Sequence, residues 1–404
     1  MINIALLGLG TVGTGVAEIL GKRHVELEAL TGQDIILKKI LVQDVSKKRN
    51  INLIDGVIVS DFNEILNDKD IDIIIEATGN LELSYKYIIE GLKADKHIVT
   101  ANKAVVSKYF EEFSSLAAKN NLAFLYEASV GGGIPIIKPL KEQLFLNELS
   151  EVQGILNGTC NYILTRMVNE GKNYDEVLKM AQKLGYAEAD PTADVEGHDT
   201  LRKLRILGSL ALQGQILEDD ILIGGISTIT SFDIELIKMI NSTVKLIAEA
   251  KLFEDGFTAV VQPTIVSNSN YFANVDMIYN SVAFKGDNIG ELKYYGSGAG
   301  SLPTANAILS DVLDIILDTY RKGNPLGNKQ LSNLNSKIRG EYYIRISDTN
   351  DKIIHVLRGI AKRVLTIGSI TAIITNEMKL ADINELLSSL EVKKKRYFLA
   401  RILN

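Results

Sequence analysis

Cysteine and histidine are both scarce in this sequence, which limits the chemistry open to it. Cys160 is the only cysteine among 404 residues, so the chain cannot form an intramolecular disulfide. His24, His97 and His355 stand apart from any cluster with the spacing of metal ligands. His198 precedes an acid on a predicted helix, where neighbouring side chains point in different directions. We therefore predict no catalytic metal and no catalytic histidine.

The sequence also lacks a basic excess and a long apolar run. Its formal net charge is −6 and its pI is about 5.5, whereas nucleic-acid and anionic-membrane partners require a basic face. The start, MINIALLGLG, has no signal-peptide pattern, and no apolar stretch is long enough to span a bilayer. We expect a soluble cytoplasmic protein with small-molecule partners, and its length allows two or three domains.

The first residues predict a dinucleotide-binding turn. Residues 2 to 7 (INIALL) have the pattern of a buried strand, and Gly8, Gly10 and Gly13 follow in GLGTVG, before the helical pattern TGVAEILGKR. Such glycines permit a tight turn, close approach to a pyrophosphate and close packing of helix on strand. The free N–H groups at the helix start attract phosphates. We expect Thr11 and Val12, within this turn, to line the same site.

The second predicted strand leaves the choice between NAD and NADP open. IILKKILVQD ends near Gln43 and Asp44, and Ser46-Lys47-Lys48-Arg49 follows. An acid at this strand end holds the ribose diol of NAD, whereas cations accommodate the 2′-phosphate of NADP. Both signals are present, and the basic run is equally typical of a solvated loop.

Further strand ends predict the rest of a ligand-binding edge. Thr78 and Gly79 end the strand of DIDIIIEATGN, and Lys103 follows the strand of KHIVTANKAVV. Because ligands of open α/β sheets bind at the carboxyl ends of strands, we expect these residues to contact cofactor or substrate. The next segment, LAFLYEASVGGGIPIIKPL, has a three-glycine run. It ends the alternation of strands and helices, so we place a domain boundary at residues 130 to 140.

Residues 185 to 204, GYAEADPTADVEGHDTLRKL, predict a reactive site. From Gly197 onward the pattern is helical, which puts Asp199 and Lys203 on one face within hydrogen-bonding reach. A lysine held there could exchange a proton with an oxygen. Acids before bases on a helix are also common surface electrostatics. The loop around Pro191, rich in acids and poor in apolar residues, favours a ligand-binding function instead.

Residues 148 to 166 predict a strand that enters a helix through Asn157-Gly158-Thr159. N–H groups at that helix start would suit the carboxylate of an amino-acid substrate. Cys160 lies just inside the helix start, where a thiol pKa can fall, and we expect it to be packed rather than nucleophilic.

The second half of the chain predicts an α+β domain and a small terminal module. We expect a helix over FDIELIKMINSTVKLIAEAKL, then strands FTAVVQPTIV and YNSVAFKGD, in an antiparallel-leaning sheet. YYGSGAG at 294 to 300 leads into a helix with Pro303 near its first turn. Residues 323 to 340 are turn-rich and predict a linker. Residues 341 to 404 predict a βαββαβ module with a helix through about Arg363 and about one strand missing.

Six motifs together resemble the homoserine dehydrogenase family. They are GLGTVGTGV, TANKAVV, EASVGGGIPII, GILNGTCNYIL, GYAEADPTADVEGHDTLRKLRIL and YYGSGAGSLPTANAI, in order over residues 1 to about 320. The resemblance implies reversible NAD(P)-dependent reduction of L-aspartate 4-semialdehyde to L-homoserine, in threonine, methionine and isoleucine biosynthesis. It implies an α/β fold with a Rossmann-type domain (1–135, completed by about 296–320) and an α+β substrate and dimerisation domain (136–295), in a homodimer or higher homo-oligomer.

The resemblance also implies roles for individual residues. Lys203 matches the family's proton donor, with Asp199 as its partner. Lys103 matches the lysine beside nicotinamide and substrate, and the glycine turn with Gly298 contacts the cofactor. The residues implied to bind substrate are Glu188, Asp194, Tyr186, Thr159 and Gly158. The family's sodium ion, held largely by backbone carbonyls, would map to Glu127, Val130, Gly132 and Ile134.

The C-terminal module resembles the ACT domain that many homoserine dehydrogenases carry. Here it is expected to be shortened, and its first loop, DTNDKIIHVL, lacks the glycine that usually opens an ACT effector site. We therefore expect the module to serve mainly in assembly. Two alternatives remain: an aspartate dehydrogenase-like oxidoreductase would have no reason for the Asp199–Lys203 pair, and a non-catalytic NAD(P)-sensing protein would be expected to lose the acidic loop or the lysine.

Overall fold

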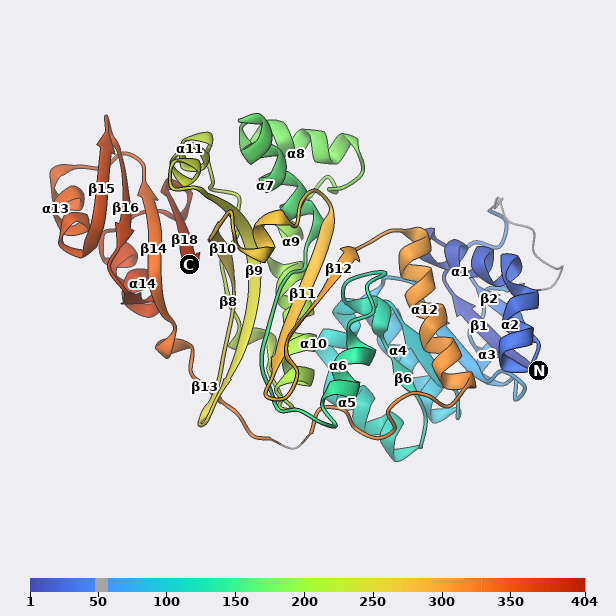
Figure 1. The fold of residues 1–404 in the computed structure, drawn as a ribbon. Helices are drawn as coiled ribbons and strands as arrows, with labels where there is room; N and C mark the ends of the chain where they lie inside the picture. Colours follow the sequence, from blue (N-terminus) through green and yellow to red (C-terminus); the bar gives the residue numbers. More distant parts are fainter. Residues whose placement is uncertain (48–56, 328, 404) are drawn as a thin grey trace.

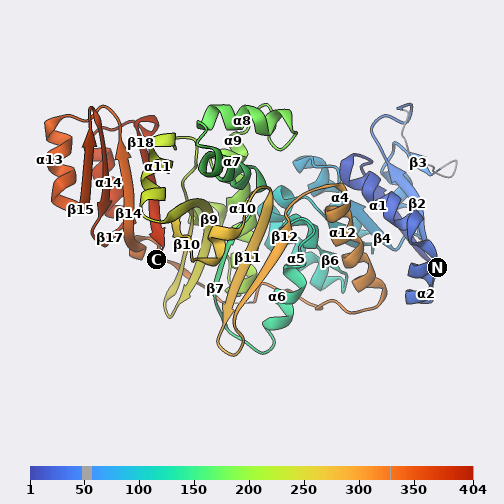
Figure 2. The ribbon, with the colours of Figure 1, turned by 45° about the horizontal axis from the view of Figure 1, so that its top comes forward.

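The computed structural model describes residues 1–47, 57–327 and 329–403. The chain forms an α/β unit at its N-terminal end, a large mixed sheet in the middle and a smaller unit at its C-terminal end (Figure 1). A second view, turned by 45°, shows the same order (Figure 2). No helix in these three ranges is both long enough and apolar enough to span a membrane.

The N-terminal unit is built on a parallel sheet with the strand order β3-β2-β1-β4-β5-β6. The order reverses direction at β1, so the carboxyl ends of β1 and β4 form the crevice in which such sheets bind ligands. The strands are β1 (Ile2–Leu7), β2 (Ile35–Leu41), β3 (Ile58–Val59), β4 (Ile73–Glu76), β5 (His97–Thr100) and β6 (Phe124–Leu125). The predicted Rossmann-type fold is confirmed.

Helices cover both faces of this sheet. They are α1 (Thr11–Lys22), α2 (His24–Thr31), α3 (Asn63–Leu66), α4 (Leu81–Lys93), α5 (Lys103–Lys119) and, from much later in the chain, α12 (Ser301–Ile316). At Gly15 on α1, an added Cβ would lie 2.8 Å from Ser301 Oγ and 3.1 Å from Ala305 Cβ of α12. The small residue allows α12 to pack closely on α1, as Figure 1 shows.

The second sheet runs without interruption from the middle of the chain into the C-terminal unit. Its order is β12-β11-β7-β9-β10-β18-β14-β16-β15. Along this order the neighbours within the middle unit are antiparallel, while the short strand β8 pairs parallel with β10 outside it. The parallel pairing of β10 with β18 joins the C-terminal unit to the middle unit. The strands are β7 (Leu149–Ile155), β8 (Leu222–Ile223), β9 (Ser242–Phe253), β10 (Gly256–Ser267), β11 (Tyr279–Gly286), β12 (Gly290–Ser297), β13 (Ser332–Asn333), β14 (Arg339–Ile346), β15 (Ala361–Ile367), β16 (Ile370–Thr375), β17 (Met378–Lys379) and β18 (Tyr397–Leu403).

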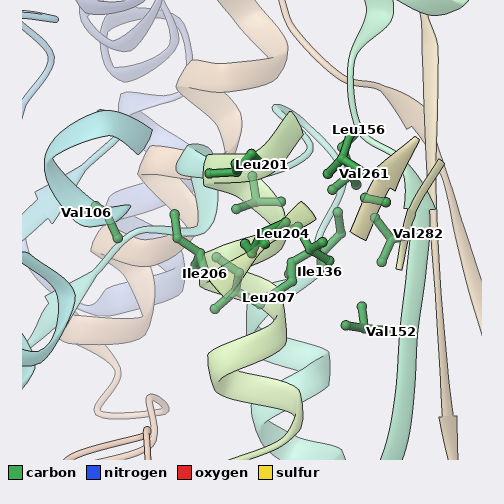
Figure 3. Packing of buried hydrophobic residues seen from close by; sticks show 14 of the residues in the cluster. Val106, Ile136, Val152, Leu156, Leu201, Leu204, Ile206, Leu207, Val261 and Val282 are labelled. Atoms are coloured by element: carbon green, nitrogen blue, oxygen red, sulfur yellow. The ribbon is translucent and has the colours of Figure 1, made fainter. Parts of the chain in front are cut away.

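One long helix, α10, lies between this sheet and the N-terminal unit. Leu201, Leu204 and Leu207 of α10 pack in one core with Val106 of α5 and Val261 of β10 (Figure 3). The burial of these side chains fixes α10 in place, since each buried leucine contributes about 1.5–3 kcal/mol. The helices of the middle unit are α6 (Ile137–Gln143), α7 (Gly158–Glu170), α8 (Tyr174–Lys183), α9 (Thr192–Val195), α10 (His198–Ala211) and α11 (Ser231–Met239).

The helix predicted over residues 232 to 252 is wrong in its second half. Helix α11 ends at Met239, and residues 242 to 253 form strand β9. β9 pairs with β10 along its full length and with β7 on its other edge, and residues 243–250 are all buried. The inner part of β9 alternates between apolar and mostly polar residues, but its Leu, Ala, Glu and Lys residues are also strong helix formers, and this propensity favoured a helix.

The C-terminal unit contains every strand of the predicted βαββαβ order, so the expectation that about one strand is missing is wrong. Its elements follow the order β14, α13 (Asp351–Ile360), β15, β16, β17, α14 (Leu380–Ser389) and β18. The predicted helix through Arg363 concealed the start of β15, because α13 ends at Ile360 and β15 begins at the next residue. The glycine near this boundary, Gly359, lies inside the last turn of α13, and no loop residue separates the two elements. β13 and the first residues of β14 also lie within the predicted linker.

Candidate active site

The first two turns of α10 carry the predicted lysine–carboxylate pair. Gly197 precedes the helix with φ 89°, a left-handed conformation that glycine tolerates without a Cβ clash. Lys203 Nζ lies 2.8 Å from Asp199 Oδ2 and donates a hydrogen bond to the backbone oxygen of Leu156 at 2.7 Å. Both side chains are buried. The helical spacing therefore brings the pair together as predicted.

Lys103 reaches the same carboxylate from the N-terminal unit. Its Nζ lies 2.6 Å from Asp199 Oδ1, while 42% of its side chain stays exposed. Lys103 begins α5, where the Asn102 side chain accepts hydrogen bonds from two backbone N–H groups. Asp199 thus holds one lysine from each side of the boundary between the two units.

Asn157 is the residue of this cluster to which the sequence assigned no site role. Its Nδ2 donates to Asp199 Oδ2 at 2.8 Å and to Asp194 Oδ1 at 2.7 Å. Its Oδ1 accepts from the backbone N–H of Cys160 at 2.8 Å and so caps α7. An asparagine at a helix start signals such a cap, but the two carboxylates it joins are distant in sequence.

Burial and the two lysines set the charges in the cluster. Burial acts to raise the pKa of Asp199, but the two ammonium groups outweigh it and hold that pKa far below its usual range. Burial lowers the pKa of Lys203, and the positive charge of Lys103 adds to this effect, while Asp199 opposes both. For Lys103, burial acts to lower the pKa and the attraction of Asp199 raises it overall. Lys203 is therefore the lysine that loses its proton more readily.

The predicted substrate loop lies beside this cluster and is largely open. Thr159 Oγ1 donates to the backbone oxygen of Tyr186, whose ring packs 5.1 Å from that of Tyr162. Tyr186 is 40% exposed, and Glu188 is exposed with its backbone oxygen held by Gln182. The loop thus offers a free carboxylate to a ligand. Burial raises the pKa of Asp194.

Gly158 and Cys160 have structural reasons for their positions. A Cβ on Gly158 would lie 2.7 Å from the backbone oxygen of Ile278, so only glycine fits at the start of α7. Cys160 is fully buried, its Sγ contacts the backbone oxygen of Asp194 at 3.2 Å, and burial raises its pKa well above the usual value. A buried thiol of this kind is a poor nucleophile.

The glycine turn after β1 has the shape that a pyrophosphate requires. A Cβ on Gly13 would lie 2.0 Å from the backbone oxygen of Gly8, whereas a Cβ on Gly10 would meet nothing within 4 Å. Gly13 therefore closes the turn, and Gly10 leaves open space at the start of α1. The backbone oxygen of Thr11 accepts a hydrogen bond from Ser301 Oγ at 2.6 Å, and Val12 packs against the core beneath.

A buried carboxylate that the sequence did not single out organises the end of β4. Glu76 is fully buried and accepts hydrogen bonds from the hydroxyls of Thr78, Ser84 and Thr100, each at 2.7 Å. These bonds hold Thr78 at the strand end. Gly79 follows with φ 72°, and nothing lies within 4 Å of its missing Cβ. The predicted cofactor edge is open at this point.

The three-glycine run packs against the later glycine turn. A Cβ on Gly132 would lie 2.5 Å from the backbone of Gly298, and a Cβ on Gly298 would lie 2.2 Å from the Asn280 side chain. Gly298 is thus held beside the first unit. Val130 and Ile134 are buried within this turn.

The Glu127 carboxylate binds backbone rather than pointing to an ion. Its oxygens accept from the N–H groups of Ile136 at 2.6 Å and of Ile137 and Lys138 at 2.7 Å, at the start of α6. Any cation here would therefore be held by backbone oxygens. The three described ranges contain no group of three or more His, Cys, Asp or Glu side chains suited to a metal ion.

We predict that Gly13→Ala will weaken cofactor binding strongly. The new Cβ must displace the backbone oxygen of Gly8, and such overpacking costs about 1–3 kcal/mol. The matched control is Gly21→Ala on the same helix, where a Cβ meets nothing within 4 Å. Titration of each variant with the reduced cofactor, followed by the cofactor's own fluorescence, would give the two affinities. Equal affinities of the two variants would contradict the assignment of the turn.

Comparison with known proteins decides the family. Residues 8–127 match the family described as homoserine dehydrogenase, NAD binding domain, and residues 135–313 match the one described as homoserine dehydrogenase. The chain is 40% identical over 315 residues to the homoserine dehydrogenase of Bacillus subtilis, covering 78% of this chain and 73% of that protein. The chain belongs to the homoserine dehydrogenase family.

Other relatives support the same assignment. The homoserine dehydrogenase of Synechocystis is 40% identical over 357 residues, covering 87% of this chain and 81% of that protein. The crystal structure of a homoserine dehydrogenase from Thiobacillus denitrificans matches with a TM-score of 0.91 and 32% identity, covering 100% of this chain and 98% of that one. A hyperthermophilic archaeal homoserine dehydrogenase in complex with NADPH shares the fold, with a TM-score of 0.66 and 23% identity.

The predicted enzyme class is confirmed. The chain is an NAD(P)-dependent oxidoreductase of amino-acid biosynthesis that interconverts L-aspartate 4-semialdehyde and L-homoserine. Neither the aspartate dehydrogenase-like reading nor the non-catalytic one is favoured. Among the residues predicted to choose between NAD and NADP, Lys48 and Arg49 lie outside the described residues.

Proposed function

We propose that Lys203 is the proton donor and acceptor of this homoserine dehydrogenase, and that Asp199 holds it in place. Hydride transfer to the aldehyde builds negative charge on its oxygen, and a buried ammonium stabilises that charge and then gives up a proton. The observation that carries this proposal is the burial of Lys203 against Asp199 Oδ2 and the Leu156 backbone oxygen. Two acceptors direct its remaining N–H toward the substrate side.

We propose that the substrate's amino group binds at Glu188 and its carboxylate near the start of α7. Glu188 is exposed beside the cluster, and α7 begins at Gly158 with Thr159 next to it. A helix start supplies N–H groups to an anion. Asp194 and Tyr186 complete this substrate loop. Lys103, at the rim, contacts both the substrate oxygen and the cofactor.

The pH dependence of the two directions tests the role of Lys203. In alcohol oxidation Lys203 must be neutral to accept a proton, so kcat should rise with pH until its pKa is passed. In aldehyde reduction it must be charged, so kcat should fall above the same pKa. Because burial lowers that pKa, we expect both limbs below the ordinary lysine value of about 10.4. Parallel profiles in the two directions would contradict the proposal.

We propose that the cofactor is NAD or NADP, held by the turn of Gly8, Gly10 and Gly13 with Thr78 and Gly79 opposite. Asp44 Oδ1 accepts from the N–H and hydroxyl of Ser46, at 2.8 and 2.6 Å, so the turn after β2 places an acid and a hydroxyl side by side at the end where the ribose would bind. The cofactor supplies the hydride, and the protein supplies orientation. Initial rates with L-homoserine and either NAD or NADP would decide the preference.

We also propose a homodimer or higher oligomer and a structural sodium ion. The ion would bind backbone oxygens of the loop containing Glu127, Val130, Gly132 and Ile134, because the Glu127 carboxylate already binds three N–H groups. Light scattering during size exclusion would give the oligomeric state. Thermal unfolding in NaCl and in KCl at equal ionic strength would test the ion.

A further inference from the structure

The junction before the catalytic helix is short. Helix α9 ends at Val195 and α10 begins at His198, so only Glu196 and Gly197 connect them. Asp199 follows within the first turn of α10. Any movement of Glu196 or Gly197 therefore changes the position of Asp199, and through it that of Lys203.

Glu196 is held from two sides by other parts of the chain. Its Oε1 accepts a hydrogen bond from Ser227 Oγ, and its Oε2 accepts one from Lys394 Nζ at 3.1 Å. Lys394 belongs to the C-terminal unit. Burial acts to raise the pKa of Glu196, but Ser227 and Lys394 outweigh it and hold that pKa below its usual value.

The segment of Ser227 fits tightly against the junction. The backbone N–H of Ile226 donates to the backbone oxygen of Val195 at 2.8 Å. A Cβ on Gly225 would lie 2.5 Å from the same oxygen and 2.7 Å from the Glu196 Cα. The junction is therefore in direct contact with residues 225–227.

The C-terminal unit also fastens the continuation of this segment. Arg345 on β14 donates from Nη2 to the backbone oxygen of Thr228 at 2.5 Å and to Asp233 Oδ2 at 3.1 Å. Tyr343 donates its hydroxyl to Asp233 Oδ1 at 2.7 Å. The side chains of Arg345 and Asp233 are 3% and 0% exposed. The unit thus holds both the junction and the segment against which it packs.

We propose that Glu196 is a positioning residue for catalysis, and that the C-terminal unit, through Lys394, fixes the start of α10 and with it Asp199 and Lys203. This inference rests on the proposed roles of Asp199 and Lys203. It assigns the C-terminal unit a part in the reaction itself, without any effector.

Lys394→Met tests the contact directly. Lys394 is exposed, so the variant should fold. An exposed ion pair contributes little, and we expect kcat with L-homoserine to fall by roughly twofold to fivefold, with the KM for the cofactor unchanged. Lys394→Arg should restore kcat. The matched control, Lys395→Met, removes the same charge from the next residue, which makes no hydrogen bond or ion pair within the part of the chain that the structure describes, and should keep wild-type kcat.

The pH profile separates positioning from a loss of stability. The groups facing Lys203 are Asp199 on α10, Lys103 on α5, Asp194 on α9 and the Cys160 thiol on α7. A loosened α10 start admits water, which weakens the burial that lowers the Lys203 pKa. In Lys394→Met the rising limb of homoserine oxidation should therefore move to higher pH, by roughly half a unit. A merely less stable protein would lose amplitude equally at every pH.

A double variant completes the test. Because Lys394 acts through Glu196, Glu196→Gln with Lys394→Met should be no slower than Glu196→Gln alone. Wild-type kcat and pH profile in Lys394→Met, or additive losses in the double variant, would overturn the inference. Failure of the proposed function would differ: Lys203→Met would then remain active in the same assay.

Discussion

Lys203→Met is expected to lower kcat for L-homoserine oxidation by about 10²–10⁴-fold, the usual contribution of a positioned acid or base. Methionine fills nearly the same buried space, so the fold should persist. Asp199 would keep Lys103 at 2.6 Å and Asn157 at 2.8 Å as partners, so no buried carboxylate is left without compensation. The cofactor turn lies elsewhere, and the Kd for NAD(P) should stay unchanged.

Steady-state kinetics and cofactor titration of the same preparation would check both parts. Lys183→Met is the matched control, because Lys183 is an exposed lysine at the end of α8 and outside the cluster. If Lys203→Met kept more than a tenth of wild-type kcat, the proton-transfer role would belong to another group. Lys103 would be the next residue to test.

The sequence predictions that agree with the structure rest on residues close together in sequence. Gly8, Gly10 and Gly13 lie within one turn, and Asp199 and Lys203 lie four residues apart on one helix, so the backbone alone brings each set together. The doubly wound order of the first sheet follows from its alternating strands and helices. In each case the informative residues are neighbours in sequence.

Contacts between residues that are distant in sequence could not be predicted from local spacing. Lys103 meets Asp199 at 2.6 Å across 96 residues of sequence, and Asn157 joins Asp194 to Asp199. No pattern within one segment encodes such a meeting. The order of the pKa effects on Lys203 also depended on its burial, which is a property of the packed core.

Two errors of secondary structure have separate physical causes. Residues 242–253 are rich in helix-forming residues, yet pairing on both edges makes them the central strand β9. β15 follows α13 directly, and Gly359 lies inside the last turn of α13, so no loop marks the change from helix to strand. Tertiary pairing overrides local propensity in the first case, and the absence of a loop conceals the strand in the second.

Arg345→Met is expected to cause the largest loss of stability of any substitution considered. Arg345 and Asp233 are an ion pair with side chains 3% and 0% exposed. Removing the guanidinium leaves a buried carboxylate whose charge is uncompensated, which costs about 3–5 kcal/mol. The hydroxyls of Tyr343 and Thr230 still donate to Asp233, at 2.7 Å each, but two neutral hydroxyls do not replace a cation.

The same strand offers the control for this prediction. Arg339→Met removes an arginine of β14 whose pair with Glu377 spans 3.4 Å and whose side chains are 54% and 67% exposed, so its loss should cost no more than about 1 kcal/mol. Urea unfolding followed by circular dichroism would compare the two. Because a desolvated pair can be replaced by apolar residues without loss, Arg345→Met with Asp233→Leu should recover part of the stability. Equal stabilities of Arg345→Met and Arg339→Met would contradict the prediction, because the buried ion pair would then contribute no more than the exposed one.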